Sequence, residues 1–407
     1  MSQGPFLVVS RAGRPAFASV LDEAQMFPLI EASFADAAKA VAQVQPSAIL
    51  ADLQGADPAQ FAALAAQIAA RKPYLPLIAV GPGHALPENA IPFSPPGGQF
   101  DRLLPRLRAA LRTRALHITV LRRLSEEPTT RLPDTDPARE ATALLIGRGG
   151  AYPALSVALG ERLGVVGAFS IEAAANHLNT RDIDGVVLGE GFSLRVVDAF
   201  LTVLSEDARF RNLPVVLTSD ELAPTYELPN LEIIKGEPAD IAANALPLIR
   251  QHAFEGRLSR TLRAIDAEGL LDPQTGLLAK ATFDRDFTNA VTQTLADGGG
   301  LSVARFAFDA ANPRAQLDGA RIISRLMRQM DFGAAQGDGS VIVVFADTDL
   351  RNAHGIARRL SAVMRHTSTG KRGSRSDPAV TVATLMPKDS PRSLLARLYG
   401  DSRRAVS

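Results

Sequence analysis

The feature that most constrains the fold is an alternation of short apolar strands and helical segments, which occurs twice along the chain. In residues 1–125, three apolar runs alternate with helical patterns: strands at 6–9, 48–51 and 75–80, and helices at 34–44, 60–71 and 101–112. The runs are continuously apolar, as in strands that are buried on both faces. Strands joined by helices of this length predict a doubly wound parallel sheet.

The pattern restarts after a proline-containing stretch at 126–137, which has no hydrophobic period and which we interpret as an inter-domain linker. In residues 140–255 the predicted elements are strands at 143–146, 185–188, 214–218 and 231–234, and a closing helix at 241–252. The same element order in both blocks indicates an internal duplication of architecture.

A helical connector at 256–268 leads into a third block of a different kind. This block mixes helices with strands at 301–308, 341–345 and 379–383, and it contains a solvated Gly, Ser, Lys and Arg loop at 367–377. The sequence therefore predicts an α/β multidomain protein. Two doubly wound (βα)5 domains, residues 1–125 and 140–255, precede an α+β domain, residues 265–407.

Composition excludes several classes of function. The formal net charge is +1, so no basic field predicts nucleic-acid binding. The chain has no cysteine, and its histidines are never paired at helical metal-ligand spacing. No apolar run reaches the roughly 18 residues of a membrane span, and the N-terminus lacks a signal-peptide layout. We expect a cytoplasmic protein without metal, cofactor, disulfide, nucleic-acid partner or membrane span.

Asp52 ends the first block's middle strand, where the receiver domains of response regulators carry their phosphorylated aspartate. Both doubly wound blocks resemble that family, whose chemistry also needs an acidic pair for Mg²⁺ and a lysine near the last strand. Ser10 and Arg11 replace the acidic pair, and no lysine lies near Ser94. The resemblance makes Asp52 a candidate phospho-acceptor without a magnesium cage. The alternative is an aspartate that caps a loop.

The second block departs further from the receiver pattern. Gly189 takes the acceptor position, with Glu190 after it, and the acidic pair reads Gly-Arg at 147–148. Only Thr218 and Lys235 match the family's phosphate-sensing residues. We therefore expect a structural adaptor whose faces are free to bind a protein partner or, in a homodimer, a second copy.

The third block carries four segments, in order and at compatible spacing, of the GGDEF family, the diguanylate cyclases. The hexapeptide Asp-Pro-Gln-Thr-Gly-Leu at 272–277 resembles the family's opening motif, and 343–349, 379–383 and 398–399 resemble later strands and the last helix. The resemblance covers about 265–407. It places the signature hairpin at 337–341, where Gly339 and Ser340 replace the two acidic residues.

Other parts of the cyclase site are altered too. Ala307 stands where the family has a metal-binding carboxylate, and the guanine-binding loop is reduced to 310–313. Two-metal activation of a hydroxyl needs carboxylates that hold the ions. The resemblance therefore implies a catalytically inactive homologue.

Arg328 and Asp331 match the family's R-x-x-D inhibitory-site motif, at the family's distance from the hairpin. The second arginine of that site falls on Arg359, beside Arg358. An arginine fork can grip guanine or phosphate, and Asp331 can accept from guanine N–H groups. The bland alternative is a solvated helix face with a surface Arg–Asp pair worth under about 1 kcal/mol.

The receiver–receiver–GGDEF order resembles a group of response regulators, and catalytic loss with a retained R-x-x-D resembles its inactive members. This implies a cyclic di-GMP effector or adaptor, cytoplasmic and at a cell pole, that takes part in cell-cycle regulation. When ligand-bound, it would help to deliver a protein substrate or regulator to a protease. Three alternatives remain: a ligand-independent dimerising scaffold, a residual cyclase with an unrecognised metal site, and a phosphorylation switch at Asp52.

Overall fold

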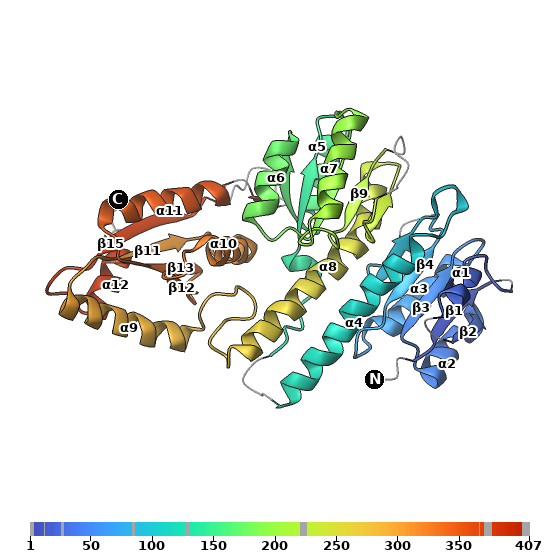
Figure 1. The fold of residues 1–407 in the computed structure, drawn as a ribbon, viewed down its shortest axis with the longest axis horizontal. Coiled ribbons are helices and arrows are strands. Elements are labelled where there is room, and N and C mark those ends of the chain that lie inside the picture. Colours follow the sequence, from blue (N-terminus) through green and yellow to red (C-terminus); the bar gives the residue numbers. More distant parts are fainter. Residues whose placement is uncertain are drawn as a thin grey trace.

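The computed structural model describes residues 4–11, 13–25, 28–83, 86–126, 131–219, 226–365, 367–369 and 377–400. These residues form three sheets (Figure 1). We call residues 4–126 the first unit, 131–266 the second unit and 267–400 the third unit. In Figure 1 the second unit, in green and yellow, lies between the blue first unit and the orange and red third unit.

The first unit is built on a five-stranded parallel sheet of order β2-β1-β3-β4-β5. Its strands are β1 Phe6–Ser10, β2 Leu29–Ser33, β3 Ala48–Asp52, β4 Leu77–Val80 and β5 Ala90–Phe93. Its helices are α1 Ala18–Glu23, α2 Phe34–Val44, α3 Pro58–Ala69, the short 3-10 turn η1 Pro96–Gly98 and α4 Leu103–Glu126. All five residues of β1 are buried, as its continuous apolar run predicts.

The second unit repeats this order in five parallel strands. Its strands are β6 Thr142–Ile146, β7 Gly164–Ala168, β8 Gly185–Leu188, β9 Val215–Leu217 and β10 Leu231–Ile233. Its helices are η2 Pro137–Glu140 (3-10), α5 Tyr152–Gly160, α6 Ile171–Thr180, α7 Leu194–Glu206 and α8 Pro238–Asp266. The doubly wound architecture predicted for both blocks is thus present.

The third unit has an antiparallel sheet of order β12-β13-β11-β15. Its strands are β11 Leu301–Ala307, β12 Phe332–Ala335, β13 Ser340–Ala346 and β15 Ala379–Thr384. Its helices are α9 Lys280–Asp297, α10 Pro313–Leu326, α11 Leu350–Met364 and α12 Pro391–Gly400. Alternate residues of β13 pack into two cores, one under α10 and α11 and the other under α9 and α12.

Sequence patterns missed three strands of the first two units, and in the third unit they also missed β12. The edge strand β2 is only partly buried, so its residues do not form a continuous apolar run. The strand β7 carries glycines at 164 and 167, and glycine is depleted in strands. The strand β5 contains Pro92, which argues against a strand unless it lies at a sheet edge, as β5 does.

Two helices are longer than predicted. The predicted break between a closing helix at 241–252 and a connector at 256–268 is wrong, because α8 runs without interruption through both. Gly256 and Pro247 each disfavour a helix interior, but α8 packs along α4, and this tertiary contact outweighs local propensity. The helix α4 likewise continues to Glu126 instead of ending near 112.

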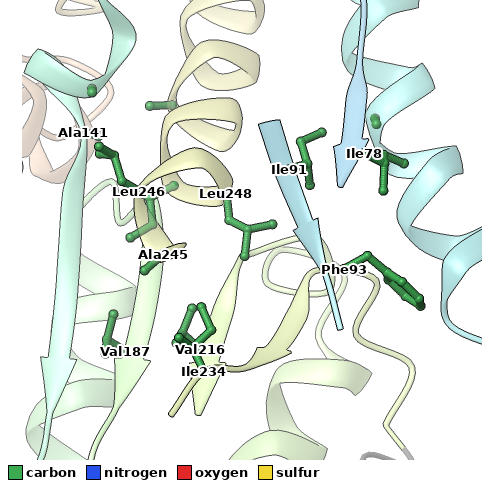
Figure 2. Packing of buried hydrophobic residues seen from close by; sticks show 14 of the residues in the cluster. Ile78, Ile91, Phe93, Ala141, Val187, Val216, Ile234, Ala245, Leu246 and Leu248 are labelled. Atoms are coloured by element: carbon green, nitrogen blue, oxygen red, sulfur yellow. The ribbon is translucent and has the colours of Figure 1, made fainter. Parts of the chain in front are cut away.

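The first and second units share one hydrophobic core. Ile91 of β5, Val216 of β9 and Leu248 of α8 belong to the same buried cluster, which spans both sheets (Figure 2). Arg106 of α4 and Glu232 of β10 form an ion pair at 2.9 Å inside this junction, with side-chain exposures of 0% and 1%. Both units therefore belong to one packed body.

The third unit docks on the second through backbone pairing and charged side chains. Its strand β14, Thr367–Thr369, pairs antiparallel with β7 and becomes a sixth strand of the second sheet. The loop predicted at 367–377 is therefore a strand in its first three residues, and 370–376 lie outside the described residues. The expectation of free faces on the second unit is wrong in part, because β14 covers the β7 edge and α4 covers α8.

The predicted linker is also packed in its second half. Residues 127–130 lie outside the described residues, whereas Asp136 caps η2 through Ala138 N at 3.2 Å. Glu140 at the end of η2 accepts hydrogen bonds from Arg257 of α8 at 2.8 Å and from Arg321 of α10 at 2.9 Å. This segment therefore joins the second unit to the third.

Candidate functional site

Arg328 lies in the turn that connects α10 to β12. The backbone N–H of Asp331 donates to the Arg328 carbonyl at 3.0 Å and closes this turn. The Arg328 side chain is exposed, and among the described residues its guanidinium makes no hydrogen bond or ion pair. The turn thus presents a cation at the base of the β12–β13 hairpin.

Asp331 is more deeply placed than a surface Arg–Asp pair requires, with a relative exposure of 7%. Its Oδ1 accepts from the backbone N–H of Ala346 at 3.2 Å, which ties the start of β12 to the end of β13. Burial raises the pKa of Asp331, and this outweighs the hydrogen bond from Ala346 and the positive charge of Arg328. One carboxylate oxygen therefore has a structural role.

The two candidate arginines of α11 are exposed. Arg358 and Arg359 lie on the helix that packs beside α10. Within the described ranges, no hydrogen bond or ion pair connects either arginine to Arg328 or Asp331. The structure therefore places all four predicted side chains on the third unit, without direct contact between the α11 arginines and the R-x-x-D turn.

The tip of the hairpin carries a different arrangement. Gly339 has a φ of +83°, a conformation that side-chain-bearing residues rarely adopt. Asp338 accepts from the Ser340 hydroxyl at 2.6 Å and pairs with Arg305 of β11 at 2.9 Å. The Arg305 guanidinium also lies 4.3 Å from the ring centroid of Tyr399. The guanidinium that engages the tip's carboxylate is thus itself in contact with an aromatic ring.

Sequence reasoning missed Arg305, and it named Tyr399 only as part of the last helix, without a role at the hairpin tip. The available signal was a single arginine within the otherwise apolar and small residues of 301–307. Burial tends to raise the pKa of Asp338, but the hydrogen bonds from Ser340 and Arg305 outweigh it and hold this pKa below its ordinary value. Asp338 therefore stays ionised at neutral pH and is engaged by these two side chains.

Ala307 faces Ser340 across the β11–β13 pair, so neither strand supplies a carboxylate at that point. Asp309 accepts from Ala311 N at 2.9 Å within its own turn. In the part of the chain that the structure describes, no group of three or more His, Asp or Glu side chains is arranged to hold a metal ion.

The opening hexapeptide at 272–277 forms a tight loop. Asp272 Oδ1 accepts from Thr275 N at 2.8 Å and from the Thr275 hydroxyl at 2.7 Å. Gly276 has a φ of +75°, and Leu277 is buried in the third unit's core. The motif's residues therefore serve loop geometry and packing.

The receiver-like positions are brought together only in part. Asp52 ends β3, and its Oδ1 accepts from Gln54 N at 3.1 Å, the arrangement of a loop cap. In the second unit Glu190, Thr218 and Lys235 line one cavity of about 410 Å³ beyond the ends of β8 and β9. Thr218 and Lys235 thus lie at the edge where the resemblance predicts them.

Among the helices of the described residues, none is both long enough and apolar enough to cross a membrane. No family model matches the chain, and no curated protein matches it.

Several solved structures are similar to about a third of the chain, and those described below contain GGDEF domains. The coiled coil and GGDEF domain of DgcB from Caulobacter crescentus, solved with c-di-GMP, is 19% identical, covers 36% of this chain and 88% of its own, and has a TM-score of 0.29. The FimX GGDEF domain from Pseudomonas aeruginosa is 17% identical, with coverages of 33% and 93% and a TM-score of 0.30. A sensory box/GGDEF family protein from Caulobacter crescentus is 22% identical, with coverages of 33% and 97% and a TM-score of 0.28. Scores of this size assign neither ligand nor activity to this chain.

Proposed function

We propose that the third unit binds cyclic di-GMP through Arg328 and Asp331, with Arg358 and Arg359 of α11 as further contacts, and that the protein is an effector without cyclase activity. The observation that carries this proposal is the contrast between the two ends of one hairpin. At the base, Arg328 is exposed and, among the described residues, unpaired. At the tip, Arg305 and Ser340 engage the carboxylate of Asp338.

The chemistry at the base suits a guanine dinucleotide. A guanidinium can donate two parallel hydrogen bonds to guanine O6 and N7 or to a phosphate. Ala346 N uses one oxygen of Asp331, so the proposal assigns the other oxygen to the guanine N1 and N2 hydrogens. Ligand binding would shift the population of molecules competent to bind a partner, in proportion to the ligand's differential affinity for that state.

The chemistry at the tip supports inactivity. Transfer to a 3′-hydroxyl by a two-metal mechanism needs carboxylates free to hold the ions. Here Gly339 and Ser340 bear none, and the ion pair with Arg305 competes with any metal for Asp338. A GTP turnover assay with Mg²⁺ or Mn²⁺ should therefore give no cyclic product, and measurable product would overturn this half of the proposal.

Isothermal titration of the full chain with cyclic di-GMP tests the binding half. Wild type should bind saturably, Arg328→Ala should not bind, and Arg351→Ala should bind like wild type. Arg351 is a matched control because it is also an exposed arginine of the third unit. Unchanged binding by Arg328→Ala would show that the site is wrongly placed, provided that circular dichroism shows both variants folded.

We also propose that the protein is an adaptor that forms a homodimer or binds a partner linked to a protease. With β7 and α8 covered within the chain, the exposed apolar residues Leu194, Val196 and Val203 of α7 are a remaining docking face on the second unit. A second candidate function is a ligand-independent scaffold, favoured by the core that the first two units share. Absence of cyclic di-GMP binding by the wild type would favour this scaffold.

A further inference from the structure

A cavity of about 330 Å³ lies where the second and third units meet. Its charged lining consists of four arginines and two aspartates: Arg260, Arg263, Arg321, Arg325, Asp182 and Asp272. Arg260 and Arg263 come from α8, whereas Arg321 and Arg325 come from α10 of the third unit. The lining therefore carries an excess of positive charge contributed by both units.

The nearby carboxylates are already engaged by other arginines. Glu140 accepts from Arg257 at 2.8 Å and from Arg321 at 2.9 Å, while Asp182 pairs with Arg325 at 3.0 Å. Arg260 lies 3.7 Å from Glu140 and 3.9 Å from Asp182, and both distances exceed those of a hydrogen bond. Arg260 thus lies near two negative charges but donates a hydrogen bond to neither carboxylate.

Arg260 is the observation that points to a ligand. Its relative exposure is 9%, and its Nε is buried with no hydrogen-bond partner among the described residues. Burial and the charge of Arg321 lower the pKa of Arg260 to about 10. A buried guanidinium without hydrogen bonds is unfavourable, because it has lost its hydrogen bonds to water and no protein acceptor replaces them. The cavity thus has more positive than negative charge on its lining, and Arg260 has no hydrogen-bond acceptor there among the described residues.

We propose that this cavity binds a phosphate-type anion, held by Arg260 and Arg263 of α8 and by those N–H groups of Arg325 that its hydrogen bonds to Asn179, Asp182 and Leu178 leave free. Guanidinium forks match the oxygens of a phosphate in geometry and donate charge-assisted hydrogen bonds. A phosphate group carries about −1.5 to −2 charge at pH 7, which offsets the excess on the lining. The volume of about 330 Å³ is far above the roughly 10–15 Å³ that one water molecule needs on the same measure, so a phosphate ester also fits.

The anion would link the second unit to the third. Its ligands come from α8 and α10, so binding neutralises charge on both sides of the junction and favours the docked arrangement. This site involves neither Arg328 nor Asp331 and does not depend on the proposed binding of cyclic di-GMP.

The test uses the full chain and inorganic phosphate. Phosphate is titrated at constant ionic strength, with chloride as the compensating anion, and melting temperature and calorimetric affinity are measured. Bound ligand raises the melting temperature of the native state by mass action. We expect this rise in wild type. In Arg263→Gln the affinity for phosphate should fall by about tenfold or more, since a hydrogen bond to a charged group contributes about 1.5–3 kcal/mol.

Arg263 is the informative variant because its side chain is exposed and has no described partner, so its removal should leave the fold intact. Arg351→Ala is the matched control and should retain phosphate binding. Charge reversal by Arg263→Glu should remove the effect completely. If phosphate stabilises wild type no more than chloride does, or stabilises Arg263→Glu equally, the proposal is overturned.

The same phosphate chemistry could come from a free anion or from a nucleotide. Cyclic di-GMP is therefore added to phosphate-loaded Arg328→Ala, in which the other proposed site is removed. Displacement of phosphate would identify the dinucleotide's phosphodiester as the occupant of the cavity. Retention of phosphate would identify a free phosphate or a monoester, and either result supports the anion site.

Discussion

The two junctions between the three units are built from different interactions. The first and second units meet through a shared apolar core, with one ion pair, Arg106–Glu232, sealed inside it. The second and third units meet through a short strand, β14, and through arginines that share too few carboxylates. Salt screens exposed charges, whereas it does not screen the interactions of an apolar core. We therefore expect salt to weaken the second junction more than the first.

The ion pairs illustrate the difference. The side chains of Arg106 and Glu232 are 0% and 1% exposed, and Arg106 Nε also donates to the Pro229 carbonyl at 2.6 Å. The side chains of Arg325 and Asp182 are 33% and 38% exposed. The second junction also contains buried pairs, Arg181–Asp318 at 3.3 Å and Arg321–Glu140 at 2.9 Å.

The largest effect is expected from Arg106→Leu. This change leaves Glu232 buried without its cation, which costs about 3–5 kcal/mol in the free energy of unfolding. Urea denaturation measures the loss. The matched change at the second junction, Arg325→Gln, should cost under about 1 kcal/mol because its ion pair is partly exposed. Equal losses for the two variants would remove the distinction between the junctions.

The second prediction concerns acid stability of the first junction. His117 of α4 accepts a hydrogen bond from Tyr74 N at 2.9 Å and lies edge-on to Phe254 of α8. Burial, with the charges of Lys72 and Arg114, lowers the pKa of His117 to about 4.

Because the folded-state pKa is below the unfolded value, the contribution of His117 to stability is fully present above pH 6.5. It is lost as the pH falls toward 4, by about 3 kcal/mol. Unfolding free energies of wild type and His117→Gln across this range test the prediction. His117→Gln should show a shallower pH slope, and identical slopes would mean that His117 does not titrate on unfolding.

Salt should separate the two junctions. Raising KCl from about 0.1 M to about 1 M shortens the Debye length from roughly 10 Å to 3 Å. Hydrogen exchange should therefore speed up at η2 and along the β7 edge, where the third unit docks. The amides of β5 and β9, which flank the shared core, should keep their protection. Uniform loss of protection at both junctions would contradict the comparison.

The smallest effect on stability is expected within the third unit, away from both junctions. Asp331→Asn keeps an oxygen that can accept from Ala346 N and removes a charge whose burial is unfavourable. The free energy of unfolding should change by under about 1 kcal/mol, because Asn retains this hydrogen bond. Cyclic di-GMP binding should nevertheless be lost, and the titration used for Arg328 measures it.

The raised pKa of Asp331 sets the sign of its pH dependence. A raised pKa means that the folded state binds the proton more tightly, so wild type loses this contribution as the pH rises through the shifted range. Asp331→Asn should flatten that part of the stability profile. If the free energy of unfolding of wild type instead rises with pH in this range, and that of Asp331→Asn does not change with pH, the charge on Asp331 favours folding.

Much of the fold was predictable where local pattern and burial agree. The strands β1, β3 and β13 are apolar along their length because both faces of each sheet are covered, and their positions were predicted within a residue or two. Patterns failed for β7, where glycines obscure the strand, and for α8, where Gly256 suggests a break. In both cases a packed neighbour supplies stability that local propensity does not.

The candidate site divides in the same way. Arg328 and Asp331 are recognisable from their spacing to the hairpin, because that spacing is local in the chain. The ion pair of Arg305 with Asp338, and the deep burial of Asp331, are not local, since they depend on how β11, β12 and β13 are aligned.

The sequence by itself determined the classes of sheet, the order of the units and the residue types at each candidate site. It could do so because strand periodicity and motif spacing are properties of neighbouring residues. Only the tertiary structure decided which surfaces meet: the core of the first two units, the addition of β14 to the second sheet, and the arginine-lined cavity between α8 and α10. These contacts join residues that are far apart in the chain, and their energies come from burial and charge that exist only once the chain is folded.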